Sequence, residues 1–352
     1  MGRVYKWQRP LPGLDLAKLK AMLRKLYIFI LKVLALAALT DHADAQTLNE
    51  IEKSQLNPQS PSGIWTIDWS PDDKYFALGG DDSILWIYKA NGPELYKRYK
   101  MKNMIRCVSW HPQGKLLAIS IRDGDAQILN IETNQVINLI GVRYGARGIA
   151  WNYNGELLAT ADNGGIVMIW NKDGKLLRSI KKENINSYSS IDWHPSKNIL
   201  VTGGDEIRLY DTTGKLLKNI KHRKGNIYVL TVKWHPSGSF FASGDYGHAE
   251  EGDNASIIQF WKEDGSLIKT LYGSKAEYRN IRWNRDGSLL ASASDAMRIW
   301  TKDGELERMG PSDTKLWGID WNSKSNLIIT TTSNDKIRLW TNKVEPGGNK
   351  SY

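Results

Sequence analysis

The sequence predicts an all-β protein: a seven-bladed β-propeller of four-stranded antiparallel blades, closed by an N-terminal strand in blade seven. Seven tryptophans recur about every forty residues, the period of propeller repeats. Each of these landmark tryptophans ends a strand-like segment of alternating apolar residues: Trp69, Trp110, Trp151, Trp193, Trp234, Trp283 and Trp321. Each interval has room for four short strands, and the 15 tryptophans and 31 glycines suit packed blades joined by tight turns.

The third repeat displays its expected strands in order. The first strand, 147–151, alternates with period two and ends at the landmark tryptophan. The second, 156–161, is almost continuously apolar, as expected when both of its faces are covered. The third and fourth, 166–170 and 176–180, are joined by a hairpin in which Gly174 can adopt positive φ.

The other repeats contain the same elements. An aromatic residue marks the third strand of every repeat but the second, which has Ile131 there: Tyr88, Trp170, Tyr210, Trp261, Trp300 and Trp340. Fourth strands are expected at 95–99, 136–140, 216–220, 267–271 and 306–309. Repeat seven ends after its third strand, at 336–341. We therefore expect Thr47 to Ile51 to pair into blade seven as its outer strand, which closes the ring and covers an open edge.

These units resemble WD-repeats over about residues 46–345. The resemblance rests on the apolar first strand, a turn such as Ser70-Pro71-Asp72, a small-residue strand such as 290–294, and the Ile-x-x-Trp ending. The hydrogen-bonded His–Ser/Thr–Asp–Trp tetrad of that family is only partly present, with His222 as the nearest histidine. Aspartates near its acidic position are Asp82, Asp205, Asp295 and Asp335. The resemblance implies assembly or recognition on the channel-mouth face.

We divide the chain into a leader (1–45), the propeller (46–345) and a polar C-terminal tail (346–352). Residues 22–45 read as a signal peptide: a positive start, an apolar core, and a small-x-small cleavage site at Ala43 to Ala45. Export to the periplasm or outside the cell is therefore expected, without stable membrane insertion after cleavage. The alternative is an uncleaved leader that anchors the protein. Translation could start at Met1 or at Met22.

Charge and cysteine usage narrow the function classes. The chain has 48 basic and 38 acidic side chains, and much of the excess lies in the leader, so nucleic acid is not an expected partner. Cys107 is the single cysteine, which excludes an intramolecular disulfide, and we expect it to be a small buried hydrophobe. The sequence does not predict the oligomeric state.

One candidate site is a ring of residues around the channel mouth, called the mouth ring below. Equivalent positions, four residues before each landmark tryptophan, carry Trp65, Arg106, Arg147, Ser189, Leu230, Arg279 and Trp317. Arginine forks bind carboxylates and tryptophan adds flat contact area, so we predict a partner site at Trp65, Arg106, Arg147, Arg279 and Trp317. The alternative is that these arginines pair with aspartates or carbonyl groups inside the protein.

The second candidate is an insertion in repeat five, residues 245–254, expected on the same face as the ring. Five of its side chains form a predicted specificity loop: Asp245, His248, Glu250, Glu251 and Asp253. Oxygen and nitrogen ligands of this kind can bind a divalent cation, but their spacing matches no known metal loop, so no metal is predicted. A solvated or partner-contacting loop, and a salt link to the arginine ring, remain open.

No catalytic signature is present, and no cofactor is predicted. His111, His194 and His235 each precede proline in equivalent turns, which is typical of repeat architecture. The sequence therefore predicts a non-enzymatic scaffold that binds an acidic protein or peptide at the channel mouth. The alternative function is an exported propeller enzyme or glycan-binding protein with a metal site on the repeat-five insertion.

Overall fold

The computed structural model describes most of the propeller region of the chain. The described residues are 46–47, 50–51, 63–91, 94–124, 126–142, 144–181, 187–223 and 227–342. The chain divides into two units, Met1–Ala45 and Gln46–Tyr352. The predicted signal peptide and the predicted tail lie outside the described residues. In the part that is described, no helix is long and apolar enough to cross a membrane.

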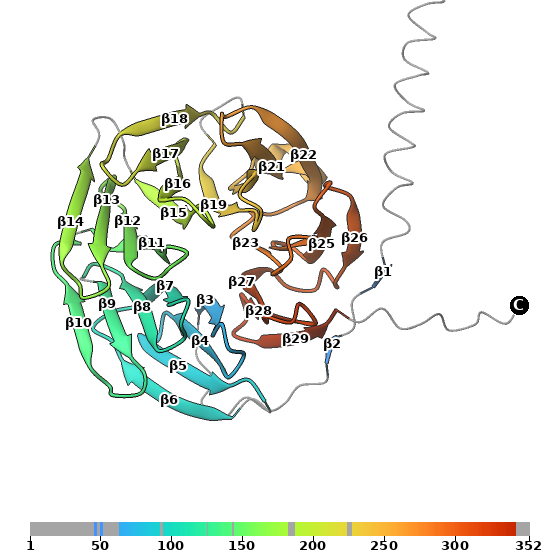
Figure 1. Cartoon of the computed structure of the whole chain (residues 1–352). Coiled ribbons are helices and arrows are strands. Elements are labelled where there is room, and N and C mark those ends of the chain that lie inside the picture. The colour runs from blue at the N-terminus through green and yellow to red at the C-terminus, as the bar shows by residue number, and fades with distance from the viewer. Residues whose placement is uncertain are drawn as a thin grey trace, which may run out of the picture. The chain divides into compact units, whose positions relative to one another are not determined.

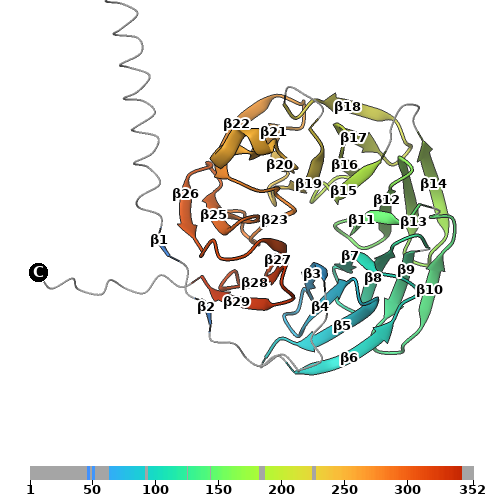
Figure 2. The ribbon, with the colours of Figure 1, turned by 180° about the vertical axis from the view of Figure 1, so that it is seen from behind.

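The described strands form seven sheets arranged around a central axis, as Figures 1 and 2 show from the two faces. The prediction of a seven-bladed, all-β propeller is confirmed. Within a blade, consecutive strands pair antiparallel, and the chain runs from the innermost strand outward. The first strand of every blade therefore lies nearest the central axis, and the predicted mouth ring belongs to these strands.

Blade one contains β3 (Ile64–Trp69), β4 (Tyr75–Gly80), β5 (Ile84–Lys89) and β6 (Leu95–Lys100). Blade two contains β7 (Ile105–Trp110), β8 (Leu116–Ile121), β9 (Ala126–Asn130) and β10 (Val136–Leu139). Blade three contains β11 (Ala146–Trp151), β12 (Leu157–Asp162), β13 (Ile166–Asn171) and β14 (Leu176–Lys181). Blade four contains β15 (Tyr188–Trp193), β16 (Ile199–Gly204), β17 (Ile207–Asp211) and β18 (Leu216–Ile220).

Blade five contains β19 (Val229–Trp234), β20 (Phe240–Asp245), β21 (Ser256–Lys262) and β22 (Leu267–Ser274), with the 3-10 helix η1 (Ala249–Asn254) between its second and third strands. Blade six contains β23 (Asn280–Trp283), β24 (Leu289–Ala293), β25 (Met297–Thr301) and β26 (Leu306–Met309). Blade seven contains β27 (Leu316–Trp321), β28 (Leu327–Thr332) and β29 (Ile337–Thr341). The N-terminal strands are β1 (Gln46–Thr47) and β2 (Glu50–Ile51).

The apolar core lies between neighbouring blades. Leu85 and Ile87 of blade one, for example, share a buried cluster with Leu117 and Ile119 of blade two. Second strands are covered on both faces, and five of the six residues of β12 are buried. This layering explains the almost continuous apolar runs of the second strands.

The landmark tryptophans connect one blade to the next. The indole Nε1 of Trp110 donates to the carbonyl oxygen of Asp68 in the preceding blade at 3.0 Å. Trp193 and Trp321 donate in the same way to the preceding blades, at 2.9 and 3.0 Å. Within the described residues, the indole N–H groups of Trp69, Trp151 and Trp234 have no acceptor, although their rings are buried. The rings are buried in six blades and partly buried at Trp283 of blade six, so burial is the role that the repeat shares, and the hydrogen bond is added in some blades.

The three histidines that precede proline also join neighbouring blades. Nε2 of His111, His194 and His235 lies 2.8–3.0 Å from the carbonyl oxygen of the turn glycine in the following blade. Nδ1 of each ring accepts a backbone N–H two residues further on. The neutral tautomer with the proton on Nε2 satisfies both contacts. Burial lowers the pKa of all three imidazoles below the usual 6.5.

These histidines should make folding stability depend on pH. The pKa of such a histidine is lower in the folded protein than in the unfolded chain, where it is about 6.5. Its contribution to stability is complete at pH values above the unfolded-state pKa. That contribution is lost as the pH falls through the folded-state pKa. Urea unfolding at pH 5, 6, 7 and 8 should therefore show a loss on the acid side. His111→Gln, whose amide can still donate to Gly155, should reduce that loss. Equal pH dependence in the variant and the parent would contradict this role.

The N-terminal strands close the ring. Glu50 and Ile51 of β2 pair antiparallel with Trp340 and Leu339 of β29, which confirms an N-terminal strand in blade seven. The prediction was wrong for Thr47, because β1 pairs in parallel with β26 of blade six, with Thr47 opposite Met309. The segment therefore joins two blades, and blade six becomes a five-stranded sheet.

Deleting residues 46–51 should destabilise the propeller at blades six and seven. The deletion removes two short ladders, each worth a few backbone hydrogen bonds, so we expect a loss of about 2 to 4 kcal/mol. It also exposes the edges of β26 and β29, which should increase aggregation. Urea unfolding and light scattering measure the two effects. A truncated protein with unchanged stability and solubility would show that β1 and β2 do not close the ring.

Candidate functional site

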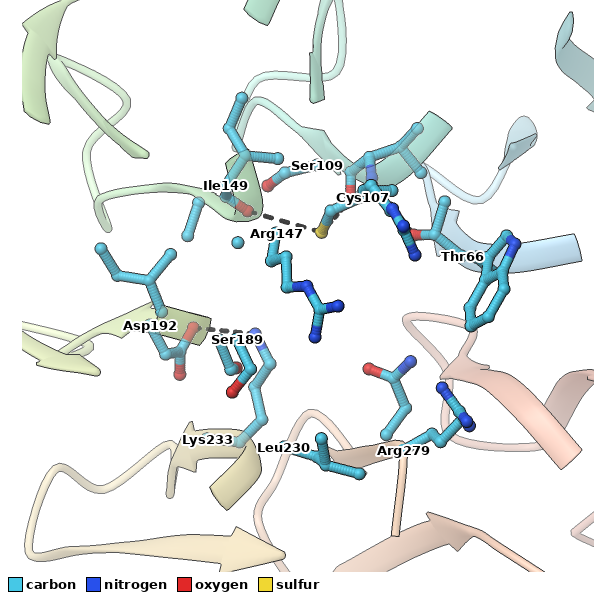
Figure 3. Close-up of a pocket in the computed structure, with 18 of the residues that line it drawn as sticks. Thr66, Cys107, Ser109, Arg147, Ile149, Ser189, Asp192, Leu230, Lys233 and Arg279 are labelled. Atoms are coloured by element: carbon cyan, nitrogen blue, oxygen red, sulfur yellow. Dashed lines mark hydrogen bonds and ion pairs between the residues drawn. The ribbon is translucent and has the colours of Figure 1, made fainter. Parts of the chain in front are cut away.

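The mouth ring surrounds a central cavity of about 670 Å³, lined by the first strands of several blades. Figure 3 shows Arg147, Ser189, Leu230 and Arg279 around it. Six of the seven predicted mouth residues line this cavity: Trp65, Arg106, Arg147, Ser189, Leu230 and Arg279. The seventh, Trp317, stacks on Trp65 with ring centroids 4.5 Å apart. The structure thus brings together all the positions that the repeat phase predicted.

Local strand geometry explains why these side chains reach the mouth. In five blades the ladder between the first and second strands shifts register at the mouth residue, so that this residue is the extra one of a β-bulge. The five bulged residues are Trp65, Arg106, Arg147, Ser189 and Leu230. A bulge leaves one residue unpaired and re-aims its side chain, and bulges are frequent beside functional sites.

Two tryptophans and two arginines form a layered stack at the junction of blades one and seven. Trp65 and Trp317 are stacked with an interplanar angle of 14°. The guanidinium carbons of Arg106 and Arg279 each lie 5.2 Å from the centre of the Trp65 ring, and that of Arg279 lies 5.6 Å from the Trp317 ring. Nε1 of Trp65 also donates to Asp81 at 2.6 Å. Cation–π contacts therefore fix the positions of two mouth arginines.

The three mouth arginines differ in their partners. Arg279 forms an ion pair with Glu277 at 3.0 Å. This contact agrees with the alternative hypothesis, in which the mouth arginines pair inside the protein. Arg106 and Arg147 form no ion pair with any residue that the structure describes, and the Nε atom of each is buried without a hydrogen-bond partner. Burial, and then the neighbouring charge of Arg147, lower the pKa of Arg106. Two positive charges therefore face the cavity, and Arg147 points toward its centre (Figure 3).

A second ring, the channel ring, is formed by the residues directly before the landmark tryptophans. It consists of Asp68, Ser109, Ala150, Asp192, Lys233, Arg282 and Asp320. Lys233 pairs with Asp192 at 3.0 Å, and Arg282 lies 3.6 Å from Asp320. Each aspartate also accepts the backbone N–H of the landmark tryptophan in the following blade, at 2.6–2.8 Å. The channel ring thus links neighbouring blades, and all of its members except Asp320 line the cavity.

Asp68 has a different environment from the other two aspartates. It forms no ion pair within the described part of the chain, and Asp320 lies nearby. Burial, and then the Asp320 charge, raise the pKa of Asp68 to about 7. The channel ring was not predicted, although the tripeptide Ile-Asp-Trp ends three first strands, at 67–69, 191–193 and 319–321. Cys107 is half-buried and lines the cavity too, which differs from its expected role as a small buried hydrophobe.

The repeat-five insertion differs from its prediction. Asp245 ends β20 and is fully buried, with Oδ2 2.9 Å from Nε of Arg223 and 3.3 Å from Nε2 of His222. Nδ1 of His222 contacts the Ser243 hydroxyl at 2.9 Å, and Trp261 donates to that hydroxyl at 2.8 Å. Blade five therefore contains the complete tetrad of which the sequence showed only part. Asp245 belongs to that tetrad, so it is not an exposed specificity residue.

The rest of the insertion is held by Arg223. This side chain pairs with Glu251 at 3.1 Å and donates to the Ala255 carbonyl at 2.7 Å. His248 is exposed just before η1, whereas the side chains of Glu250 and Asp253 lie outside the description. No group of three His, Cys, Asp or Glu residues in the described segments could hold a metal ion. Tyr246, which the sequence analysis did not single out, lines the central cavity.

Comparison with known families agrees with this architecture. The profile of the WD40 domain of anaphase-promoting complex subunit 4 matches residues 67–146. The profile of the WD domain, G-beta repeat, matches residues 140–171, 214–249, 265–300 and 304–341. The chain belongs to the WD-repeat β-propeller superfamily. The β-propeller is a fold that serves as a platform for surface sites.

Individual relatives are distant. Protein HIR1 of Cryptococcus neoformans var. neoformans is 25% identical over 183 residues, which are 43% of this chain and 20% of that protein. The probable cytosolic iron-sulfur protein assembly protein 1 of Candida glabrata is 26% identical over 142 residues, 36% of this chain and 40% of the relative. The serine-threonine kinase receptor-associated protein of Rattus norvegicus is 25% identical over 243 residues, 67% of this chain and 54% of the relative. The matches thus span about a fifth to about a half of these relatives.

Proposed function

We propose that this protein is a non-enzymatic scaffold that binds an acidic protein or peptide partner at the channel mouth. The observation that carries the proposal is the pair Arg106 and Arg147, whose charges face the cavity without an anionic partner among the described residues. Half-buried charges without counterions are costly, and a ligand carboxylate would supply two acceptor oxygens to each guanidinium fork. Acidic ligands are therefore favoured over basic ones.

The surroundings of the arginine pair support the same proposal. Arg106 is held against Trp65, so little side-chain entropy is lost when it binds a ligand. Tyr246 and Tyr228 add aromatic surface to the lining of the same cavity. Arginine and aromatic residues are the types that dominate the binding energy of protein interfaces. Export through a cleaved leader is a further part of the proposal, and its support is the sequence of residues 22–45 alone.

The alternative of a metal-dependent enzyme or glycan-binding protein has weaker support. It depends on carboxylates of the repeat-five insertion being free to bind an ion. Asp245 is held by His222 and Arg223, and Glu251 is held by Arg223 as well. These contacts favour a structural role for both carboxylates.

Binding of defined peptides tests the proposed site. Peptides rich in glutamate or aspartate should bind, and matched peptides with glutamine and asparagine should not. Arg106→Ala combined with Arg147→Ala should weaken acidic-peptide binding by at least about 30-fold, since truncating a hot-spot residue typically costs about 2 kcal/mol or more. Salt should weaken the parent's binding, because rim charges are screened.

Arg178→Ala provides a matched control, because Arg178 lies exposed on the outer strand β14 of the same blade as Arg147. That control should bind like the parent. Acidic peptides that bind the double variant as tightly as the parent, with the fold of the variant intact by circular dichroism, would exclude the mouth as the site. Failure of the double variant to fold would instead assign these arginines a structural role and contradict the proposed site.

A further inference from the structure

The cations that line the cavity differ in whether an acid pairs with them. Three cations are each close to an acid: Lys233 to Asp192, Arg282 to Asp320, and Arg279 to Glu277. The cations that remain are Arg106 and Arg147, and their mutual repulsion contributes to the lowered pKa of Arg106. The site of the proposed function therefore carries two neighbouring positive charges that no described acid neutralises by an ion pair.

We propose that Arg106 and Arg147 together form a subsite for one doubly charged oxyanion of the phosphoryl class. This inference rests on the proposed function, because it names the chemistry that the same mouth recognises. One carboxylate has two oxygens and is satisfied by one guanidinium fork. A phosphoryl group has three acceptor oxygens and a charge of about −1.5 to −2 at pH 7, so a single group can engage both arginines.

The tryptophans limit the other ligand chemistries. One face of Trp65 is stacked on Trp317, and the guanidinium groups of Arg106 and Arg279 lie over the same ring. A nucleobase or a methylated ammonium group would need an open aromatic face. Because neighbours already cover Trp65, recognition at this subsite uses the charge and the N–H groups of the arginines.

The bulges preorganise the subsite. Arg106 and Arg147 are both the extra residue of a bulge, in neighbouring blades two and three. Their backbones belong to innermost strands, and Trp65 fixes the Arg106 side chain from blade one. Preorganised donors bind an anion without first ordering a loop, which reduces the entropy lost on binding.

Sulfate titration of the full chain tests the subsite, since sulfate keeps its double negative charge across neutral pH. Intrinsic tryptophan fluorescence should respond, because Trp65 contacts Arg106. Acetate and sodium chloride at matched ionic strength are the references, and both should bind at least about tenfold more weakly than sulfate. Arg147→Met should weaken sulfate binding about tenfold or more, whereas Arg178→Met should not change it.

Two further arms separate the sources of the oxyanion. A phosphoserine peptide that binds more tightly than inorganic phosphate and than its glutamate counterpart would assign the group to a partner protein. Equal binding of phosphopeptide and inorganic phosphate would support a site for the free anion. Sulfate that binds no better than acetate, or that binds Arg147→Met like the parent, would overturn the inference. Acidic peptides that still depend on Arg106 and Arg147 in that case would leave the proposed function standing.

Discussion

Asp245→Asn should lower the free energy of unfolding by about 3 to 5 kcal/mol, the range seen when one partner of a buried ion pair is removed. The Asp245 carboxylate is fully buried and lies between His222 and Arg223. It also accepts the backbone N–H of Ile257 at 2.9 Å. An asparagine oxygen can keep that backbone contact but leaves the Arg223 guanidinium without its buried counterion. Urea unfolding at pH 7 measures the change.

Glu251→Gln is the matched control, because Glu251 pairs with the same arginine but is almost half exposed. Exposed ion pairs are worth about 0 to 1 kcal/mol, so this variant should stay within about 1 kcal/mol of the parent. Acidic-peptide binding should survive in both variants when they are assayed under folded conditions. Similar losses of stability in the two variants, or selective loss of peptide binding in Asp245→Asn, would contradict the structural role of Asp245.

Asp245 also shows where sequence reasoning reached its limit. Its place in the chain, directly before Tyr246 and Gly247, reads equally well as the end of a strand or as the start of an exposed insertion. What decides between them is the approach of His222 and Arg223 from the preceding loop. Such a contact depends on the spatial neighbours of a blade, which strand periodicity does not report.

The positions of the mouth-ring residues, by contrast, follow from the periodicity of the repeat. These residues occupy one phase of a repeat, and the phase alone places Arg106 and Arg147 on one face of the ring. The sequence also contains the difference between the arginines, because Glu277 lies two residues before Arg279, whereas Met104 and Gly145 stand at the equivalent positions before Arg106 and Arg147. The prediction did not use this difference, and the structure shows it as the Arg279–Glu277 ion pair. The stacking of Trp65 on Trp317 was not predictable from strand periodicity, since these residues meet only when blade seven closes on blade one.

Ring closure and the proposed binding site therefore share one part of the molecule. The junction of blades one and seven holds the Trp65–Trp317 stack and the bond from Trp69 N–H to Asp320 at 2.7 Å. The Thr331 hydroxyl also crosses it, donating to the Ile64 carbonyl at 3.1 Å. Because Trp65 positions Arg106, a weakened junction would disturb the mouth even when every mouth residue is present.

The charged centre of the channel should respond to Arg282 in a pH-dependent way. Arg282 is the cation next to Asp320, and its charge also lowers the pKa of Asp68. Arg282→Met keeps much of the side-chain volume but leaves these two neighbouring acids without it. At pH 8 we expect a loss of about 3 to 5 kcal/mol of unfolding free energy, as for other buried pairs that lose one partner.

The loss should shrink as the pH falls. The pKa of Asp68 is already raised from its ordinary value of 3.8 to about 7 in the folded protein. An acid whose pKa is raised by folding costs little stability at pH values below its unfolded-state pKa. The cost grows as the pH rises through its folded-state pKa. Removing Arg282 raises the folded-state pKa values of Asp68 and Asp320 further. The unfolding free energies of parent and variant, measured from pH 5 to pH 8, should therefore diverge toward pH 8.

A second substitution identifies the acid that carries the effect. Asp68→Asn in the Arg282→Met background should recover much of the stability at pH 8, because Asp320 then has no charged acid beside it, and the amide oxygen can still accept the Trp110 N–H that Asp68 accepts at 2.6 Å. Lys302→Met, at an exposed lysine of the same blade, should change little at any pH. A loss for Arg282→Met that is equal at pH 5 and pH 8, with no recovery from Asp68→Asn, would mean that the arginine acts by packing. In that case its charge would not govern the acids of the channel ring.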